Sequence, residues 1–476
     1  MPVRPESSTA ARSSVLAHGT CLLLTLGLVG CGSSGPTYAE VAPIIESNCV
    51  GCHRDGAIAP FPLTTYDEVF AVKELVADAV ASGRMPPWQA SDECNQYQNN
   101  TDLTPDSKQM LLDWLDGGAK QGRHRTEIDA KPAVPFTPDL TLPLPEPYTP
   151  TQLDDYRCQI IETGLTEPAW VTGFAAIPDR ADLVHHVIAY RIDADKRERF
   201  DAMDAEFEGV GWPCYGSAAA PGFDLSEIDL ADVPIGDLLE MFENGEAIDA
   251  LGGFGWLGSW APGSTGGFFP PDTGIAIAPG DFIVVQMHYN TAAGAGRDQS
   301  SIGITLADTV RKPAITVPYT DPAWVADLPF LGDPMTIPAG STNTTHSTGL
   351  DGDGPLFVYV RSQLDLPEGT PVSVHSVAHH MHTLGKTGRQ TVVHGDGTET
   401  CLLDIPDWDF DWQSRYELAE PVTIGLDDEI VLTCSWDNSA SNQPVVDGVI
   451  AEPVDVAWGE GTRDEMCLGI LYLTGP

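Results

Sequence analysis

The stretch FIVVQMHYN, residues 282–290, is one of six short apolar runs that decide the fold of most of this chain. Each run has the length of a β-strand, and turns rich in glycine, proline and aspartate separate them. With 47 Gly and 39 Pro among 476 residues, the composition is typical of a turn-rich β protein. The runs extend too far for one sandwich, so we expect two in tandem, at 153–312 and 313–476. The other runs are 183–192, 356–360, 372–380, 429–436 and 467–473.

Two less regular segments flank the first expected sandwich. Residues 200–269 are acidic at first and then rich in Gly and Trp, which predicts an inserted, partly helical lid. Residues 126–152 contain repeated prolines, which favour an extended, semi-rigid linker.

Residues 32–125 form a different, helical unit. Residues 38–48 are amphipathic, and residues 66–82 carry apolar side chains at helical spacing. A third helix is expected to begin after Thr104, with Pro105 in its first turn, and to end at Gly117.

Between the first two of these helices lies Cys49-Val50-Gly51-Cys52-His53. In a Cys-x-x-Cys-His segment, Cys49 and Cys52 can form thioethers to one haem, and His53 can bind its iron. The order of helices around this motif resembles a class I cytochrome c domain, which implies a covalent haem c and a sixth iron ligand. Met85, in the proline-stiffened loop 84–88, is the expected ligand, and core packing is its alternative role. Met110 is a competitor whose helical spacing points to the core.

The N-terminus reads as an export signal over residues 1–31. Arg4 and Arg12 precede a short apolar run, residues 21–29, which is too short to cross a bilayer. Residues 28–31, LVGC, resemble the lipobox of bacterial lipoproteins, which implies lipidation of Cys31. The alternative is an ordinary secretory signal cut a few residues later. We therefore expect a protein of the bacterial periplasm or cell surface, held to a membrane only by its lipid anchor. The outer membrane is favoured because no retention signal follows Cys31.

Charge and cysteine content limit the partners and the redox setting. Lys and Arg number 24 against 69 Asp and Glu, a formal net charge of −45, which argues against nucleic acid and against a basic membrane-binding face. Solubility is the simplest role of this acid excess, with a cationic partner as the alternative. Six cysteines remain after the export and haem motifs, and they predict disulfides of undetermined pairing. They are Cys94, Cys158, Cys214, Cys401, Cys434 and Cys467.

Histidines gather in two groups. His380 and His382 are two residues apart, so on a strand their imidazoles face the same side and can share a metal ion. Imidazole suits Zn, Cu, Fe and Ni, so the pair does not choose the metal. His185 and His186 are adjacent, and both can reach one ion, with His288, only where the strand bulges or ends. Otherwise one of the two lies in the core and the other in solvent.

Four short motifs occur in the order LVHHV (183–187), QMHY (286–289), HMHTLGK (380–386) and DEMC (464–467). They closely resemble the ligand motifs of the copper type II, ascorbate-dependent monooxygenases, over roughly residues 154–474. The resemblance implies two jelly-roll sandwiches facing across an open cleft, with one copper ion in each. It assigns the electron-transfer copper to His185, His186 and His288, and the catalytic, oxygen-binding copper to His380, His382 and Met466.

The same resemblance implies a disulfide between Cys434 and Cys467. Cys158 with Cys214 is the second pair we expect, and Cys94 and Cys401 have no assigned role.

The resemblance also implies a reaction, the O2-dependent hydroxylation of a C–H bond with electrons from ascorbate. The helical unit in front leads us to hypothesise that haem replaces or supplements ascorbate, drawing on a periplasmic electron donor. Members of the family that hydroxylate peptides hold a substrate carboxylate with polar residues, and Ala378, Leu468 and Ile470 stand at those positions. We therefore expect a small apolar or aromatic substrate.

Two alternatives to this reading stay open. One is a non-catalytic haem and copper lipoprotein that passes electrons or holds copper. The other is the same scaffold with zinc in the histidine sites.

Overall fold

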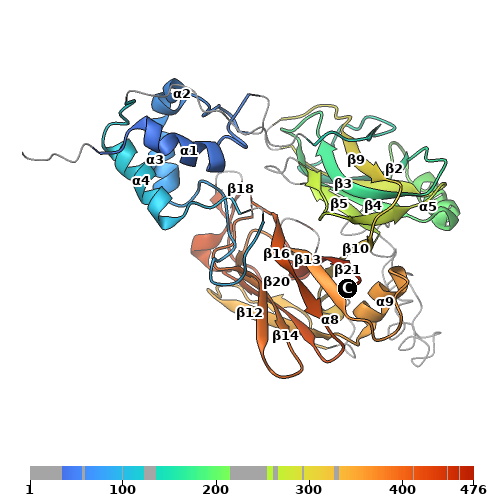
Figure 1. Ribbon diagram of the computed structural model, residues 1–476. Helices are drawn as coiled ribbons and strands as arrows, with labels where there is room; N and C mark the ends of the chain where they lie inside the picture. Colours follow the sequence, from blue (N-terminus) through green and yellow to red (C-terminus); the bar gives the residue numbers. More distant parts are fainter. Residues whose placement is uncertain are drawn as a thin grey trace, which may run out of the picture.

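The computed structural model is described over twelve ranges of the chain, and it comprises a small helical unit and two larger β parts (Figure 1). Cys31 with the expected export signal, and most of the expected lid, lie outside these ranges. Within them, no helix is both long and apolar enough to cross a bilayer. The ranges are 35–55, 59–98, 100–122, 136–214, 255–260, 266–291, 294–325, 332–410, 412–446, 449–459, 461 and 463–476.

The helical unit has four helices around its own core. The Thr104 side chain caps the last helix by accepting a hydrogen bond from the Ser107 amide, and Pro105 occupies the first position, as the sequence predicts. The helix expected over 66–82 is divided at Val72, whose φ of −120° and ψ of 18° depart from helical values. Met110 is 40 % exposed, so its expected core position is wrong. The helices are α1 Tyr38–Asn48, α2 Tyr66–Ala71, α3 Lys73–Ala81 and α4 Pro105–Asp116.

The first β part encloses an apolar core, and β8 is its most deeply buried strand. Eight of the nine side chains of β8 are buried, because the strand is paired with β2 on one side and β4 on the other. The strands are β1 Leu140–Pro143, β2 Asp154–Glu162, β3 Ala169–Ile177, β4 Val184–Ile192, β5 Trp256–Trp260, β6 Gly267–Phe268, β7 Thr273–Ile277, β8 Phe282–Asn290 and β9 Ser301–Ala307. Between β4 and β5 lie the short helices η1 Ala194–Lys196 and α5 Arg197–Ala205.

Part of the expected proline-rich linker belongs to this sandwich. β1 pairs antiparallel with β9, and Leu144 and Tyr148 after it are buried in the core. The segment is extended, as the prolines predict, but its apolar side chains pack on the sandwich from Phe136 onward, whose ring lies 5.4 Å from that of Phe268.

The second β part holds its core between two sheets. One contains β16, β13, β21 and β10, and the other has the order β12-β17-β14-β15. Strand β10 also pairs with β5 and β7, so hydrogen bonding continues from one β part to the other. Its elements are β10 Lys312–Tyr319, α8 Pro322–Val325, β11 Thr336–Ile337, β12 Thr344–Asp351, α9 Pro355–Gln363, β13 Val372–His380, β14 Gly385–Val393, β15 Glu399–Ile405, β16 Arg415–Ile424, β17 Glu429–Trp436, η2 Ala440–Asn442, β18 Val445–Val446, β19 Val449–Ile450, β20 Val456–Ala457 and β21 Leu468–Thr474.

Five of the six apolar runs are strands within a residue or so of their expected bounds, but the run 356–360 is wrong. It lies in helix α9, which begins with Gly354 as N-cap and Pro355 at the first position. Leu356, Phe357 and Val360 are buried on one side of this helix. A short, wholly apolar run fits a buried helix as well as a strand, and the preceding Gly-Pro decides for the helix.

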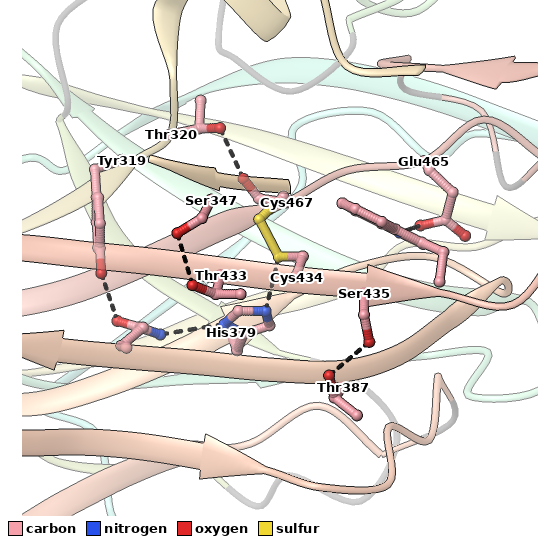
Figure 2. The surroundings of a disulfide bond; sticks show 12 residues. Tyr319, Thr320, Ser347, His379, Thr387, Thr433, Cys434, Ser435, Glu465 and Cys467 are labelled. Atoms are coloured by element: carbon pink, nitrogen blue, oxygen red, sulfur yellow. Dashed lines mark hydrogen bonds between the residues drawn. A yellow bond between two sulfur atoms is a disulfide. The ribbon is translucent and has the colours of Figure 1, made fainter. Parts of the chain in front are cut away.

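Three disulfides are present among the described residues. Cys434–Cys467 and Cys158–Cys214 form as expected, and Figure 2 shows the first of them between β17 and the start of β21. Cys94–Cys401, for which the sequence offered no role, joins the helical unit to β15 across 307 positions of the chain.

Candidate metal centre

Three histidines from two neighbouring strands of the first sandwich meet at one point. His185 and His186 lie near the start of β4, and His288 lies near the end of β8. The pairing of β4 with β8 shifts register between Val184 and His186. Such an irregularity is what two adjacent histidines need in order to face the same neighbour.

The geometry of these three imidazoles suits a metal ion. His288 Nδ1 lies 3.2 Å from His185 Nδ1 and 3.2 Å from His186 Nδ1, and one nitrogen of each ring lies within 4.8 Å of the others. Two nitrogens that each lie about 2.0–2.1 Å from a shared ion are 3.2 Å apart when the nitrogen–metal–nitrogen angle is roughly 105°.

Asp154 sets the tautomer of His288. Its carboxylate accepts from His288 Nε2 at 3.2 Å and from Asn290 Nδ2 at 3.0 Å. Because Nε2 carries the proton, Nδ1 of His288 presents its lone pair to the other two imidazoles. One lone pair cannot accept a hydrogen bond well from two neighbours, whereas a single cation satisfies all three nitrogens.

The second group lies at the end of β13. His380 is the last residue of this strand and His382 follows it, so the expected strand covers only one of the pair. His380 Nδ1 donates to Gln413 Oε1 at 2.5 Å, and His382 Nδ1 donates to the Asp464 carbonyl at 2.9 Å. Both rings therefore keep Nε2 for a ligand, and their centroids are 5.0 Å apart. His375 and His379, from the same sequence cluster, hydrogen-bond elsewhere, to Thr474 and Cys434.

Met466 is buried just before β21, the strand that pairs with β13. In this pairing Leu468 lies opposite His380. Cys467, the next residue, is anchored to β17 by its disulfide with Cys434 (Figure 2). The thioether therefore belongs to a segment that two neighbouring strands hold in place.

Glu465 is a further residue that fixes this segment, and the sequence reasoning did not single it out. Its wholly buried carboxylate accepts hydrogen bonds from the His382 amide at 2.9 Å, the Leu384 amide at 2.6 Å and Trp436 Nε1 at 2.9 Å. Burial raises the pKa of Glu465 to about 7. Its place inside the motif DEMC was the available signal, because an acidic residue between buried positions needs several donors.

All five imidazoles line one pocket. Tyr156 and Phe410 also line it. The Tyr156 ring stacks on His288 with 4.0 Å between ring centroids. The Phe410 ring stacks on His185 with 5.4 Å between centroids and meets the edge of His382 with 6.2 Å between centroids. The resemblance implied two metal sites facing across an open cleft, whereas here both histidine groups contribute to the same small space. The lining residues are Tyr156, His185, His186, His288, His380, His382, Phe410 and Gln413.

Burial keeps four of the pocket's imidazoles neutral. Burial lowers the pKa of His185 and of His382 to about 4 and that of His380 to about 3, and it holds the pKa of His186 well below its usual value. The neighbouring imidazoles lower these pKa values further, because each disfavours a second positive charge. At neutral pH the free nitrogens of these four rings are therefore unprotonated, as metal ligands must be.

The Cys-x-x-Cys-His segment also has the chemistry that a haem needs. Cys49 and Cys52 are free thiols, and His53 Nδ1 donates to the Phe61 carbonyl at 3.0 Å, which leaves Nε2 for an iron. The Met85 side chain is 42 % exposed, while Pro86 beside it is buried. Cys49, Cys52 and His53 thus have the thiols and the free imidazole nitrogen that haem attachment uses, and Met85 stays an expected ligand.

Comparison with known proteins supports the assignment of the second sandwich. Residues 358–474 match the family described as copper type II ascorbate-dependent monooxygenase, C-terminal domain. This range contains His380, His382 and Met466, and it supports a copper monooxygenase-like function for this part of the chain. The helical unit and the first sandwich lie outside the matched range.

Solved structures offer only distant likeness. Allantoicase is 10 % identical, with 62 % of this chain and 83 % of that chain covered and a TM-score of 0.15. A structure of infectious bursal disease virus, Gx strain, is 8 % identical in sequence, with 72 % of this chain and 74 % of that chain covered and a TM-score of 0.16. At these scores neither superposition bears on the fold. None of the curated proteins matches the chain.

Proposed function

We propose that this protein is a copper-dependent monooxygenase that hydroxylates a C–H bond of a small substrate with O2. The observation that carries the proposal is the pocket lined by five imidazoles, two buried and three half-buried, of which three place a nitrogen within 4.8 Å of one another. When bound, two copper ions supply one-electron chemistry, so that C–H, O2, two electrons and two protons give C–OH and water.

The two histidine groups suit different tasks. His185, His186 and His288 offer three nitrogens and no sulfur ligand, which suits a copper ion that passes electrons without the strong colour of a thiolate site. His380 and His382, with Met466 as the third ligand, add a soft thioether that favours Cu(I), the state that reacts with O2. Asp154 and Gln413 orient a ring in each group and keep the ligating nitrogen unprotonated.

The substrate proposed for this site is small and apolar or aromatic. Ala378 and Ile470 lie opposite each other on β13 and β21, and Leu468 lies opposite His380. None of these three side chains can bind a carboxylate, and Arg415, opposite Ala378 on β16, is already paired with Glu417.

The helical unit is proposed to deliver electrons. Cys49, Cys52, His53 and Met85 would hold a haem c, which supplies a one-electron carrier on the same chain. The donors proposed are ascorbate, a periplasmic reductant acting through the haem, or both. The export signal and the lipid anchor on Cys31 belong to this proposal, because they would place the protein where haem c is attached and disulfides persist.

The test uses purified full-length protein. Two copper ions and one haem per chain, with O2 uptake in the presence of ascorbate, are expected. The variants His288→Ala and His382→Ala should each lose one copper ion and all O2 uptake above the uncatalysed rate. A wild-type protein that binds two copper ions yet consumes no O2 with any of a panel of apolar substrates would contradict the monooxygenase proposal.

The electron route has its own experiment. The haem is reduced in a stopped-flow instrument without ascorbate, and the Cu(II) signal is followed by electron paramagnetic resonance. Loss of the Cu(II) signal as the haem is reoxidised is expected. A haem that stays reduced beside oxidised copper would refute electron delivery through the helical unit.

One observation favours a second candidate, a non-catalytic haem and copper protein that passes electrons or holds copper. Phe410 contacts both His185 and His382, so it occupies the space between the two histidine groups that a substrate would need. Two bound copper ions with reversible one-electron reduction, and no O2 uptake even in a Phe410→Ala variant, would favour this candidate.

A further inference from the structure

Among the described residues, the segment 88–98 bonds the helical unit to the second sandwich, and we call it the clasp (Figure 1). The Ser91 amide donates to the Asp404 carbonyl at 2.8 Å, and the Gln98 amide donates to the Glu417 carbonyl at 2.7 Å. Cys94 forms the disulfide with Cys401 between these two hydrogen bonds. The clasp is thus bonded to β15 and β16, strands that lie more than 300 positions further along the chain.

Aromatic packing reinforces the clasp. Trp88 meets Tyr416 at 5.0 Å and Tyr97 at 5.7 Å between ring centroids, and Tyr97 meets Tyr416 at 5.5 Å. Tyr416 is 1 % exposed and Tyr97 is 8 % exposed, so these rings belong to the core of the second sandwich. Burial of aromatic surface on this scale holds the clasp in one position.

Gln89 extends the clasp to the loop between β15 and β16. Its Nε2 donates to the Asp409 carbonyl at 2.9 Å and to the Trp412 carbonyl at 2.8 Å. The same loop carries Phe410 and Gln413, two residues that line the histidine pocket. Both side-chain amide protons of Gln89 therefore hydrogen-bond to the backbone of a loop that contacts the candidate metal ligands.

The start of this loop is held separately, because the Trp408 amide donates to the Lys386 carbonyl at 2.9 Å and Trp408 Nε1 donates to the His382 carbonyl at 3.1 Å. Gln413 Nε2 donates to the Phe410 carbonyl at 3.0 Å, and the Trp412 amide donates to the Asp409 carbonyl at 3.1 Å. These bonds shape the loop internally, whereas the two bonds from Gln89 tie its middle, at Asp409 and Trp412, to the clasp. Removing the Gln89 amide breaks both of the hydrogen bonds that tie Asp409 and Trp412 to the clasp.

We propose that the clasp is a positioning element of the histidine pocket, with Gln89 as the positioning residue. Gln89 holds the loop so that Gln413 orients His380 and Phe410 packs on His185. The helical unit is thereby a structural part of the pocket rather than an independent carrier on a linker. That Gln89 holds the loop can be tested without metal, whereas the effect of Gln89 on bound copper rests on the proposed function.

The test compares Gln89→Met with Gln98→Met in the full-length, metal-free protein. Both changes remove a side-chain amide from the clasp, and Gln98 donates to the Leu418 and Ala419 carbonyls of β16, away from the loop. Hydrogen exchange at the Trp412 amide should rise about tenfold in Gln89→Met, the effect expected from losing two hydrogen bonds. It should stay unchanged in Gln98→Met, and exchange in β17 should stay unchanged in both.

A second arm uses Cu(II) alone as the probe. The electron paramagnetic resonance spectrum should change in Gln89→Met and match the wild type in Gln98→Met. Should Gln89→Met fail to fold, the paired change Cys94→Ser with Cys401→Ser loosens the same clasp and should raise exchange at Trp412. Equal exchange at Trp412 in the altered clasp and in the wild type would overturn the inference. A wild type that binds no Cu(II) would instead overturn the proposed function and leave the exchange result valid.

Discussion

The substitution Asp154→Asn tests the first histidine group with the least disturbance to shape. Asp154 Oδ1 accepts the His288 Nε2 proton at 3.2 Å, and this hydrogen bond lowers the pKa of the Asp154 carboxyl. A carboxylate behind a ligating imidazole raises the basicity of the ring, and its loss costs about 10–100-fold in metal affinity. The Asp154 side chain is 31 % exposed, so solvent weakens its effect and the lower end, about tenfold or 1.4 kcal/mol, is expected.

The assay is a Cu(I) titration against a competing chelator, in a His382→Ala background that isolates the first group. Asp396→Asn serves as the control, because Asp396 bonds only within its own exposed turn, to Thr398. The melting temperature of each metal-free variant confirms that the fold is intact. An Asp154→Asn affinity within twofold of that of the control would refute the reasoning that His288 is a metal ligand tuned by this carboxylate.

Three further predictions concern the second group, the haem motif and pH. Met466→Ala should abolish O2 uptake while one copper ion per chain remains, and metal analysis that finds both ions lost would contradict separate sites. Cys49→Ala with Cys52→Ala should make the haem extractable by acidified acetone without changing the copper content, and a haem that stays attached would refute the assigned thioethers. In the metal-free protein, burial lowers the pKa of three pocket histidines from 6.5 to about 3–4, so the unfolded chain binds protons first as pH falls. The resulting stability is fully present above about pH 6.5 and should be lost toward pH 4, and a melting temperature that does not fall between pH 7 and pH 5 would contradict this.

Capping residues and apolar runs predicted those helices and strands whose formation depends on a few neighbouring residues. Thr104 and Pro105 start helix α4 where capping chemistry predicts, and the runs 282–290, 372–380 and 429–436 coincide with β8, β13 and β17. The run 356–360 failed because a wholly apolar segment has no periodicity to separate helix from strand. Val72 was missed because its side chain fits a helix and only the backbone angles break it.

The candidate site was predictable in its residue types but not in its assembly. Adjacent histidines at 185 and 186 implied a strand irregularity, and β4 has one. The motifs could not show that His185 and His382, far apart in the chain, share a pocket with Phe410 between them. Tyr156 and Phe410 carry no motif, because stacking on an imidazole needs only an aromatic ring at the right place in space.

The amino-acid sequence by itself determined which side chains can bind metal or haem, because ligand chemistry depends on residue type and short spacing. It also determined most strands, since apolar runs and turn residues act over a few positions. Only the tertiary structure decided that Cys94 pairs with Cys401 and that Gln89 reaches the loop beside the pocket. Contacts across some 300 positions depend on how whole sheets pack, and no short stretch of chain records that packing.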